Sequence, residues 1–159
     1  MSDDTFDWQR YIKFAKELLN DIKTKEMDVE EKECKGRNII SRAYYGAYCL
    51  SRNFDQHEGW VDIDEIRDND NKGSIHKEVA KEFTRGKNFL DNQYSLKLVK
   101  KYLGKMRRIR NNADYEDIYS LESIEKDIEK SKHYADSIVK QLSMINDELN
   151  DEFNSKDFD

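Results

Sequence analysis

The sequence contains no proline, although a chain of 159 residues with average composition would carry about eight. Glycine is also scarce, with six residues, and cysteine occurs only twice. Because loop-rich β-sandwiches depend on proline and glycine in their turns, this scarcity disfavours such folds and favours long uninterrupted helices. Cys34 and Cys49 lack the CxxC spacing of zinc and redox motifs, so we expect both to be reduced thiols.

Long apolar runs are missing as well. No stretch of about 18 apolar residues occurs, so no transmembrane helix is expected. Residues 1–5 are polar and acidic, unlike the basic and apolar start of a secretion signal, and we therefore expect a cytoplasmic protein. The net charge of −6 argues against a protein that coats nucleic acid with its whole surface. We expect no metal and no cofactor, because the three histidines show no ligand spacing and no glycine-rich phosphate loop is present.

The hydrophobic residues, 36% of the chain, recur mainly at helical spacing. This pattern predicts helices over 6–22, 30–54, after an N-cap at Ser74, and over 95–115, with a short piece near 61–66. A heptad seam over 121–149 predicts a last long helix that suits a bundle, a dimer interface or both. Its members are Leu121, Ile124, Ile128, Ser131, Ala135, Ile138, Leu142, Ile145 and Leu149. We predict an all-α, up-and-down bundle of four to five helices, one domain over 1–150, and an acidic, disordered tail at 151–159.

Residues 41–48 combine small side chains with tyrosines. Gly46 lies between two alanines on the apolar face of its helix, which allows a neighbouring helix to approach closely. Tyr44 borders the core face, whereas Tyr45 points away from it together with Arg42. Aromatic residues at this spacing usually pack in a core. An outward Tyr45–Arg42 pair would alternatively line a dimer interface or stack on a base.

One segment departs from the acidic balance of the chain. Residues 96–113 hold seven basic and no acidic residues, so the rest of the chain carries −13 within the total of −6. A helical wheel assigns four of the basic residues to a solvated face: Lys97, Lys101, Lys105 and Arg108. Arg110 falls inside the apolar arc, between Val99 and Leu103. A basic helix in an acidic protein indicates a local surface for anions.

A buried guanidinium needs partners, because an isolated charge in a core is very costly. Asp114, one helical turn after Arg110, is the obvious candidate, and Arg107 and Tyr115 lie near the same edge of the arc. Two interpretations remain open for this cluster. Arg110 and Asp114 form an internal ion pair that fixes helix register or a dimer contact, or Arg110 presents its planar donors to a phosphate.

Three segments of the sequence resemble a known family. Residues 41–48 (SRAYYGAY) resemble the SRAYYAxxH helix of HEPN domains, the higher eukaryotes and prokaryotes nucleotide-binding family. Residues 74–83 (SIHKEVAKEF) are similar to that family's H-x-x-V/L-x-x-x-F helix. Leu103, Arg107, Arg110 and residues 113–115 (ADY) resemble its L-x-x-x-R-x-x-R-x-x-A-D-Y helix. The segments occur in the family's order, and the resemblance covers about residues 8–149.

The resemblance implies a helical bundle, commonly a homodimer, with the arginine facing a cleft between subunits. Many members are metal-independent ribonucleases, often toxins encoded beside a nucleotidyltransferase antitoxin. Their signature is an arginine, a polar residue and a histidine a few residues later. Here Arg110 and Asn111 match, but Tyr115 stands where the histidine is expected. A tyrosine, with a usual pKa of about 10, is a poor general base near neutral pH.

We therefore predict an RNA- or nucleotide-binding protein, as found in toxin–antitoxin or defence systems. The predicted catalytic residues are Arg110, Asn111 and Tyr115, and the predicted ligand-binding residues are Arg107, Arg110, Asp114, Tyr45 and His76. His76 contributes only if its helix faces the same cleft, whereas His57 is expected in a loop and His133 on an exposed face. The alternatives are an active ribonuclease toxin that uses Tyr115 or His76, and a non-catalytic module that docks a nucleotidyltransferase or another partner through its last helix.

Overall fold

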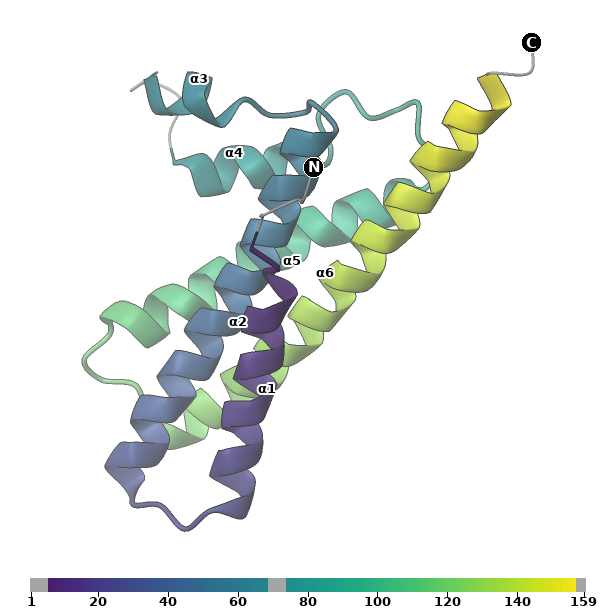
Figure 1. Ribbon diagram of the computed structural model, residues 1–159. Helices are drawn as coiled ribbons and strands as arrows, with labels where there is room; N and C mark the ends of the chain where they lie inside the picture. Colours follow the sequence, from purple (N-terminus) through teal and green to yellow (C-terminus); the bar gives the residue numbers. More distant parts are fainter. Residues whose placement is uncertain (1–5, 69–73, 157–159) are drawn as a thin grey trace.

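The computed structural model describes residues 6–68 and 74–156, which form six helices and no strand (Figure 1). The helices are α1 (Gln9–Thr24), α2 (Val29–His57), α3 (Ile63–Asp68), α4 (Ile75–Glu82), α5 (Gln93–Tyr115) and α6 (Leu121–Lys156). The predicted all-α class is confirmed. The helix number exceeds the prediction of four to five, because the short piece expected near 61–66 forms a helix of its own, α3.

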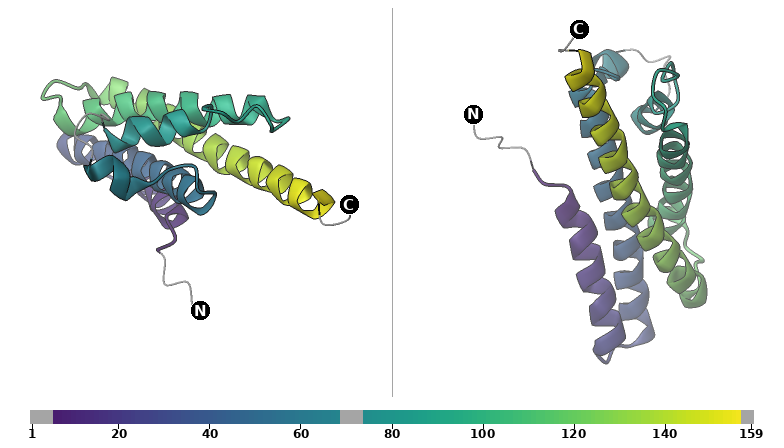
Figure 2. Two further views of the ribbon diagram at one scale, coloured as in Figure 1. Left: turned by 90° about the horizontal axis from the view of Figure 1, so that it is seen from above. Right: turned by 90° about the vertical axis from the view of Figure 1, so that its right-hand side faces the viewer.

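The long helix α2 lies at the centre and packs against α1, α5 and α6 (Figures 1 and 2). α1 and α2 form an antiparallel hairpin, and α5 and α6 form a second one beside it. The short α4 packs on α2 and α5 near the C-terminal end of α2, with α3 against it. This arrangement brings α2, α4 and α5 together, and these are the helices that carry the residues of the sequence motifs.

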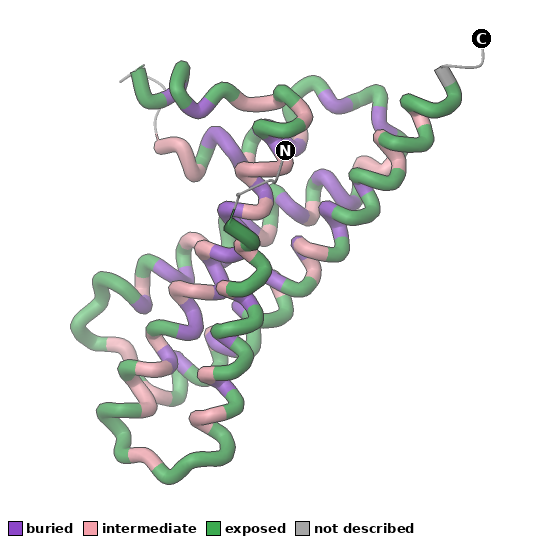
Figure 3. The backbone as a smooth tube through the Cα atoms, in the orientation of Figure 1, coloured by how far each residue is buried: buried purple, intermediate pink, exposed green. Residues whose placement is uncertain are grey.

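The heptad seam of α6 is buried inside this chain. Ile124, Ile138 and Ile145 are fully covered, and the seam faces α2 and α5 (Figure 3). At Gly36 of α2 even an added Cβ atom would collide with Ile124, so the two helices approach closely there. The seam therefore contributes to the core of the bundle and is not left exposed for a second chain.

α6 also continues past the predicted end of the domain. It runs to Lys156, six residues beyond residue 150, and its last turns extend past the body of the bundle (Figure 1). The helix continues through this polar stretch because no proline or glycine interrupts it. The side chain of Phe153 in this stretch is 67% exposed. The rest of the predicted tail, residues 157–159, lies outside the described residues.

Two further features concern membranes and cysteines. Within residues 6–68 and 74–156, no helix is long and apolar enough to cross a membrane. Both cysteines are free thiols, with Cys34 exposed and Cys49 buried in α2. The same residues contain no cluster of three or more histidine, cysteine, aspartate or glutamate side chains that could hold a metal ion.

Candidate functional site: arginines packed on tyrosines

Arg110 lies in the buried face of α5, as the helical wheel predicts, with only 6% of its surface exposed. The four basic residues that the wheel assigns to the solvated face of α5 are all exposed. Asn92 caps the start of α5 by accepting a hydrogen bond from the Ser95 amide. The charge on Arg110 therefore lies inside the bundle, near the last turn of its helix.

Arg37 of α2 holds this last turn of α5 in place. Its Nη1 donates to the carbonyl oxygens of Ala113 at 3.0 Å and Glu116 at 2.7 Å. A cation near the C-terminal carbonyls of a helix satisfies unpaired acceptors and matches the helix dipole. The turn that contains Asp114 is thereby tied to α2.

Replacing Arg37 by alanine is expected to lower the free energy of unfolding by about 1.5–3 kcal/mol, because two hydrogen bonds from a charged group are lost. Urea denaturation measures the loss, and hydrogen exchange at residues 113–116 should accelerate. Replacing the exposed Arg108 by alanine is the matched control and should change little. Equal stability of the two variants would show that Arg37 does not anchor this turn.

Arg110 has both acidic and aromatic partners. Its Nη1 donates to Asp114 Oδ2 at 3.2 Å and to the Tyr115 hydroxyl at 3.3 Å, so the predicted ion pair is confirmed. The guanidinium carbon lies 5.2 Å from the ring centres of both Tyr44 and Tyr45, and 5.7 Å from that of Tyr115. Cation–π contacts of this kind help to stabilise a desolvated guanidinium. Its Nε, however, is buried without a hydrogen-bond partner in the described part of the chain.

Tyr45 is half-buried against Arg110 and does not pair with Arg42. Arg42 lies over the ring of Tyr11 in α1, at 5.1 Å. The sequence pattern placed both side chains on the outer face of α2, but that face is shared by α1 on one side and the end of α5 on the other. The outward Tyr45–Arg42 pair is therefore not formed.

His76 of α4 reaches the same cluster. Its Nδ1 lies 2.6 Å from the Tyr44 hydroxyl, and its ring stacks on Tyr48 with 4.1 Å between ring centres. Burial, together with the nearby charges of Arg107, Arg110 and Arg52, lowers the pKa of His76 to about 4. His76 is therefore joined to the cluster through its contact with Tyr44.

Arg107 lies half-buried next to this group and forms no ion pair with any residue in 6–68 or 74–156. Its Nε is buried and has no hydrogen-bond partner among these residues. Asn111 is exposed, and its side chain makes no hydrogen bond within the described chain. It follows Arg110 directly, and one residue turns a helix by about 100°, which directs Asn111 away from the cluster.

The two remaining histidines lie elsewhere. His57 is the last residue of α2 rather than a loop residue, with Nδ1 at 3.1 Å from Glu58, because the helix continues three residues past Phe54. His133 is exposed on α6, as predicted. Neither contacts Arg110 or Tyr44.

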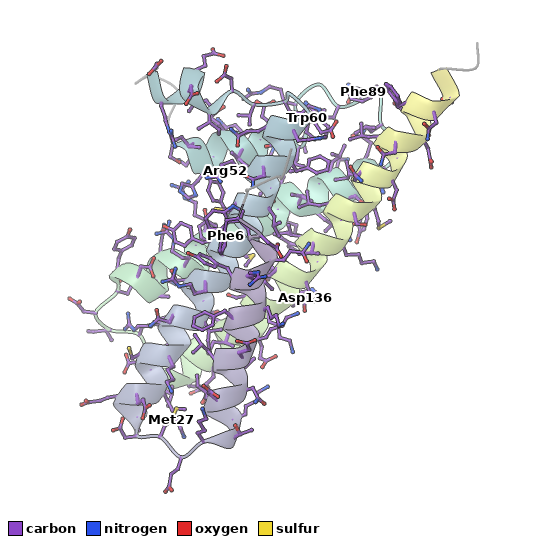
Figure 4. All side chains as sticks on the ribbon, viewed as in Figure 1. Phe6, Met27, Arg52, Trp60, Phe89 and Asp136 are labelled. Atoms are coloured by element: carbon purple, nitrogen blue, oxygen red, sulfur yellow. The ribbon has the colours of Figure 1, made fainter. Side chains whose placement is uncertain are left out.

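Three residues of the cluster are not identified as site residues by the sequence. Tyr44 and Tyr48 look like ordinary core positions of α2, and both are buried. Arg52 lies over the rings of Tyr48 and Trp8, near the start of α1 (Figure 4). The available signal was the helical spacing of Tyr44, Tyr48 and Arg52, which places all three on one side of α2.

We call this group the arginine–tyrosine site. It comprises Tyr44, Tyr45, Tyr48, Arg52, His76, Arg107, Arg110, Asp114 and Tyr115. It contains three arginines and one carboxylate, and the Arg107 and Arg110 charges lower the pKa of the neighbouring His76. Burial raises the pKa of Tyr48 to about 12 against the influence of Arg52, so this phenol stays protonated. The site is electropositive and has unfilled donors, which suits an anion.

Three hollows of the described chain lie away from this site. An apolar cavity of about 10 Å³ between α1, α2 and α6 is too small for a ligand. Open grooves of about 510 Å³ and about 460 Å³ lie between α2 and α6 and beside α3 and α4. Neither groove is lined by a residue of the arginine–tyrosine site.

Comparison of the chain with protein-family models, with curated proteins and with solved structures found no match. The resemblance to HEPN domains therefore remains a prediction from sequence motifs.

Proposed function

We propose that the protein binds RNA or a nucleotide by its phosphate groups at the arginine–tyrosine site. The observation that carries this proposal is the half-buried guanidinium of Arg107, which forms no hydrogen bond or ion pair in the described chain. A phosphate offers several strong acceptors with the geometry that a guanidinium prefers. Asp114 balances one of the positive charges and orients Arg110.

The aromatic side chains support a ligand that contains a base. Tyr115 is 72% exposed at the edge of the site, and Tyr45 is half-buried beside Arg110. Exposed rings beside cations allow a base to stack while its phosphate is neutralised. A simple inorganic anion would need only the arginines.

The sequence motifs support the same proposal. Residues 41–48, 74–83 and 103–115 are far apart in the chain, yet each contributes to the cluster: Tyr44 contacts His76, and Arg110 contacts Tyr44. We extend the proposal to a HEPN-like, cytoplasmic homodimer whose site faces a cleft between subunits. Its setting would be a toxin–antitoxin or defence system with a nucleotidyltransferase partner.

Binding without cleavage is the form of the function that the geometry favours. His76 Nδ1 is engaged by Tyr44, and no other histidine lies in the cluster. The Tyr115 hydroxyl accepts from Arg110 and donates to no acceptor in the described residues, so no base is hydrogen-bonded to the phenol. The partner-docking alternative has less support, because the apolar seam of α6 is already buried by α2 and α5.

Replacing Arg107 by alanine is expected to raise the Kd for a labelled single-stranded oligoribonucleotide or for ADP at least tenfold, because one charge-assisted contact is lost. Fluorescence anisotropy and calorimetry measure the two ligands. Arg108→Ala removes the same charge from the exposed face of the same helix, and its Kd should stay within about twofold of wild type. Both variants should keep the wild-type melting temperature.

Several results would contradict this proposal. Absence of binding of both ligands to the wild-type protein at low salt would rule it out, and equal weakening by Arg107→Ala and Arg108→Ala would reduce it to unspecific attraction. Cleavage products on a denaturing gel, lost on Arg110→Ala, would establish the ribonuclease alternative instead.

A further inference from the structure

We infer that His76 is a ligand-binding residue that presents Nε2–H as a neutral hydrogen-bond donor to a phosphate oxygen, with Tyr44 fixing its tautomer. This inference rests on the proposed function and adds one specific contact to it. It also separates His76 from the proton-transferring histidine of a ribonuclease.

Tyr44 is buried against the imidazole of His76. Its side chain is 1% exposed, and burial raises the pKa of its phenol well above the usual range, so the hydroxyl keeps its proton. A buried O–H needs an acceptor, and His76 Nδ1 at 2.6 Å is the one that the described chain supplies. Tyr44 therefore donates to Nδ1, which leaves the ring proton of the neutral imidazole on Nε2.

Two contacts hold the His76 ring in one orientation. His76 stacks on Tyr48 at 4.1 Å with an interplanar angle of 27°, and Tyr48 is itself buried. The hydrogen bond and this stack together fix the direction of Nε2 relative to α2. Nε2 has no hydrogen-bond partner in the described residues, and it is not among their buried unpaired atoms, so it reaches the surface.

The charged side chains that act on His76 are all positive. Arg107 and Arg110 on α5 and Arg52 on α2 all disfavour a protonated imidazole at this position. A neutral donor adds a contact to a phosphate oxygen without further repulsion among the cations. With Nδ1 occupied and Nε2 protonated, the ring has no free lone pair to remove a proton from a ribose hydroxyl. His76 is therefore suited to binding rather than to acid–base catalysis.

Two substitutions separate the two ring nitrogens. His76→Asn keeps an amide group near the Nδ1 position for Tyr44 but has no group at Nε2. His76→Gln extends an amide N–H to the Nε2 position. We expect His76→Asn to raise the Kd for the oligoribonucleotide and for ADP about fivefold, and His76→Gln to stay within about twofold of wild type. Melting temperatures identify any variant that binds poorly only because it is unfolded.

Nitrogen-15 NMR of the imidazole tests the tautomer without any ligand. The wild-type protein at pH 7 should show the neutral Nε2–H form, and Tyr44→Phe should give a mixture of both neutral tautomers. A neutral Nδ1–H form or an imidazolium in the wild-type protein would overturn the inference.

The binding results distinguish the two proposals. If Arg107→Ala weakens binding while His76→Asn binds like wild type, the role of His76 is wrong and the proposed function stands. If the wild-type protein binds neither the oligoribonucleotide nor ADP, the proposed function is wrong, and the donor role of His76 is wrong with it. If both ligands bind and only ADP responds to His76→Asn, the phosphate oxygen that His76 contacts belongs to a free nucleotide.

Discussion

Replacing Asp55 by asparagine is expected to raise the free energy of unfolding at pH 8 by about 2 kcal/mol or more. Asp55 of α2 is fully buried, and neither carboxylate oxygen has a hydrogen-bond partner in the described residues. Burial raises its pKa from 3.8 to about 9, with Glu82 adding to the shift and Lys87 opposing it. On folding at pH 8, Asp55 has to take up a proton, which costs about 1.4 kcal/mol for each pH unit above its pKa in the unfolded chain, whereas asparagine needs no proton and keeps the shape.

The pH dependence follows from the direction of this shift. The folded protein holds a proton on Asp55 that the unfolded chain releases above its own lower pKa. The contribution of Asp55 to the free energy of unfolding is therefore fully present below about pH 4, and it is lost progressively as the pH rises to about 9. Urea denaturation across that interval should show the stability advantage of Asp55→Asn growing with pH. The exposed Asp117 supplies the control, since Asp117→Asn should give a curve parallel to wild type. A parallel curve for Asp55→Asn would disprove the prediction.

Replacing Gly46 by leucine is expected to lower the free energy of unfolding by about 3 kcal/mol. A Cβ atom at this position would lie 2.8 Å from Ile12 Cγ1, 3.1 Å from the Trp8 carbonyl oxygen and 3.2 Å from the Ile12 amide nitrogen. Two of these are backbone atoms at the start of α1, in its N-cap residue and its first turn, so the start of the helix has to move away from α2. The prediction of close helix approach at Gly46 is thereby confirmed by the structure.

Gly104 of α5 provides the matched control for this substitution. It is exposed in a helix, and an added Cβ atom would meet nothing within 4 Å. Gly104→Leu should therefore stabilise the protein by up to about 1 kcal/mol, because leucine has the higher helix propensity. Thermal and urea denaturation of both variants should give shifts of opposite sign. Destabilisation of similar size in both would contradict the role of Gly46 in packing α1.

The long helices could be predicted because their evidence is local. The seam of α6 and the apolar arc of α5 recur at helical spacing, and no proline interrupts either helix. The burial of the seam within one chain could not be predicted, because the same spacing suits an intermolecular coiled coil. The choice depends on α2 and α5 lying beside α6, which is a property of the whole bundle.

The candidate site likewise contains some residues that a local sequence pattern predicts and others that it does not. The wheel identifies Arg110 as a charge in an apolar face, and its ion pair with Asp114 lies within one helical turn. The contact of Tyr44 with His76 joins α2 to α4 across 32 positions of the chain, so no local pattern predicts it. Asn111 illustrates the opposite case, since it matches the motif by its position but is exposed in the structure.

The two tryptophans of the chain give the bundle two separate optical reporters. Trp8 lies 5.8 Å from the guanidinium carbon of Arg52, at the edge of the arginine–tyrosine site. Trp60 packs on Phe54 and Phe83, with the amino group of Lys87 4.5 Å from its ring centre. The charge of Lys87 in turn attracts the carboxylate form of Asp55. The emission of Trp8 is therefore placed to follow an anion that reaches Arg52, and that of Trp60 to follow the ionisation of the buried carboxyl.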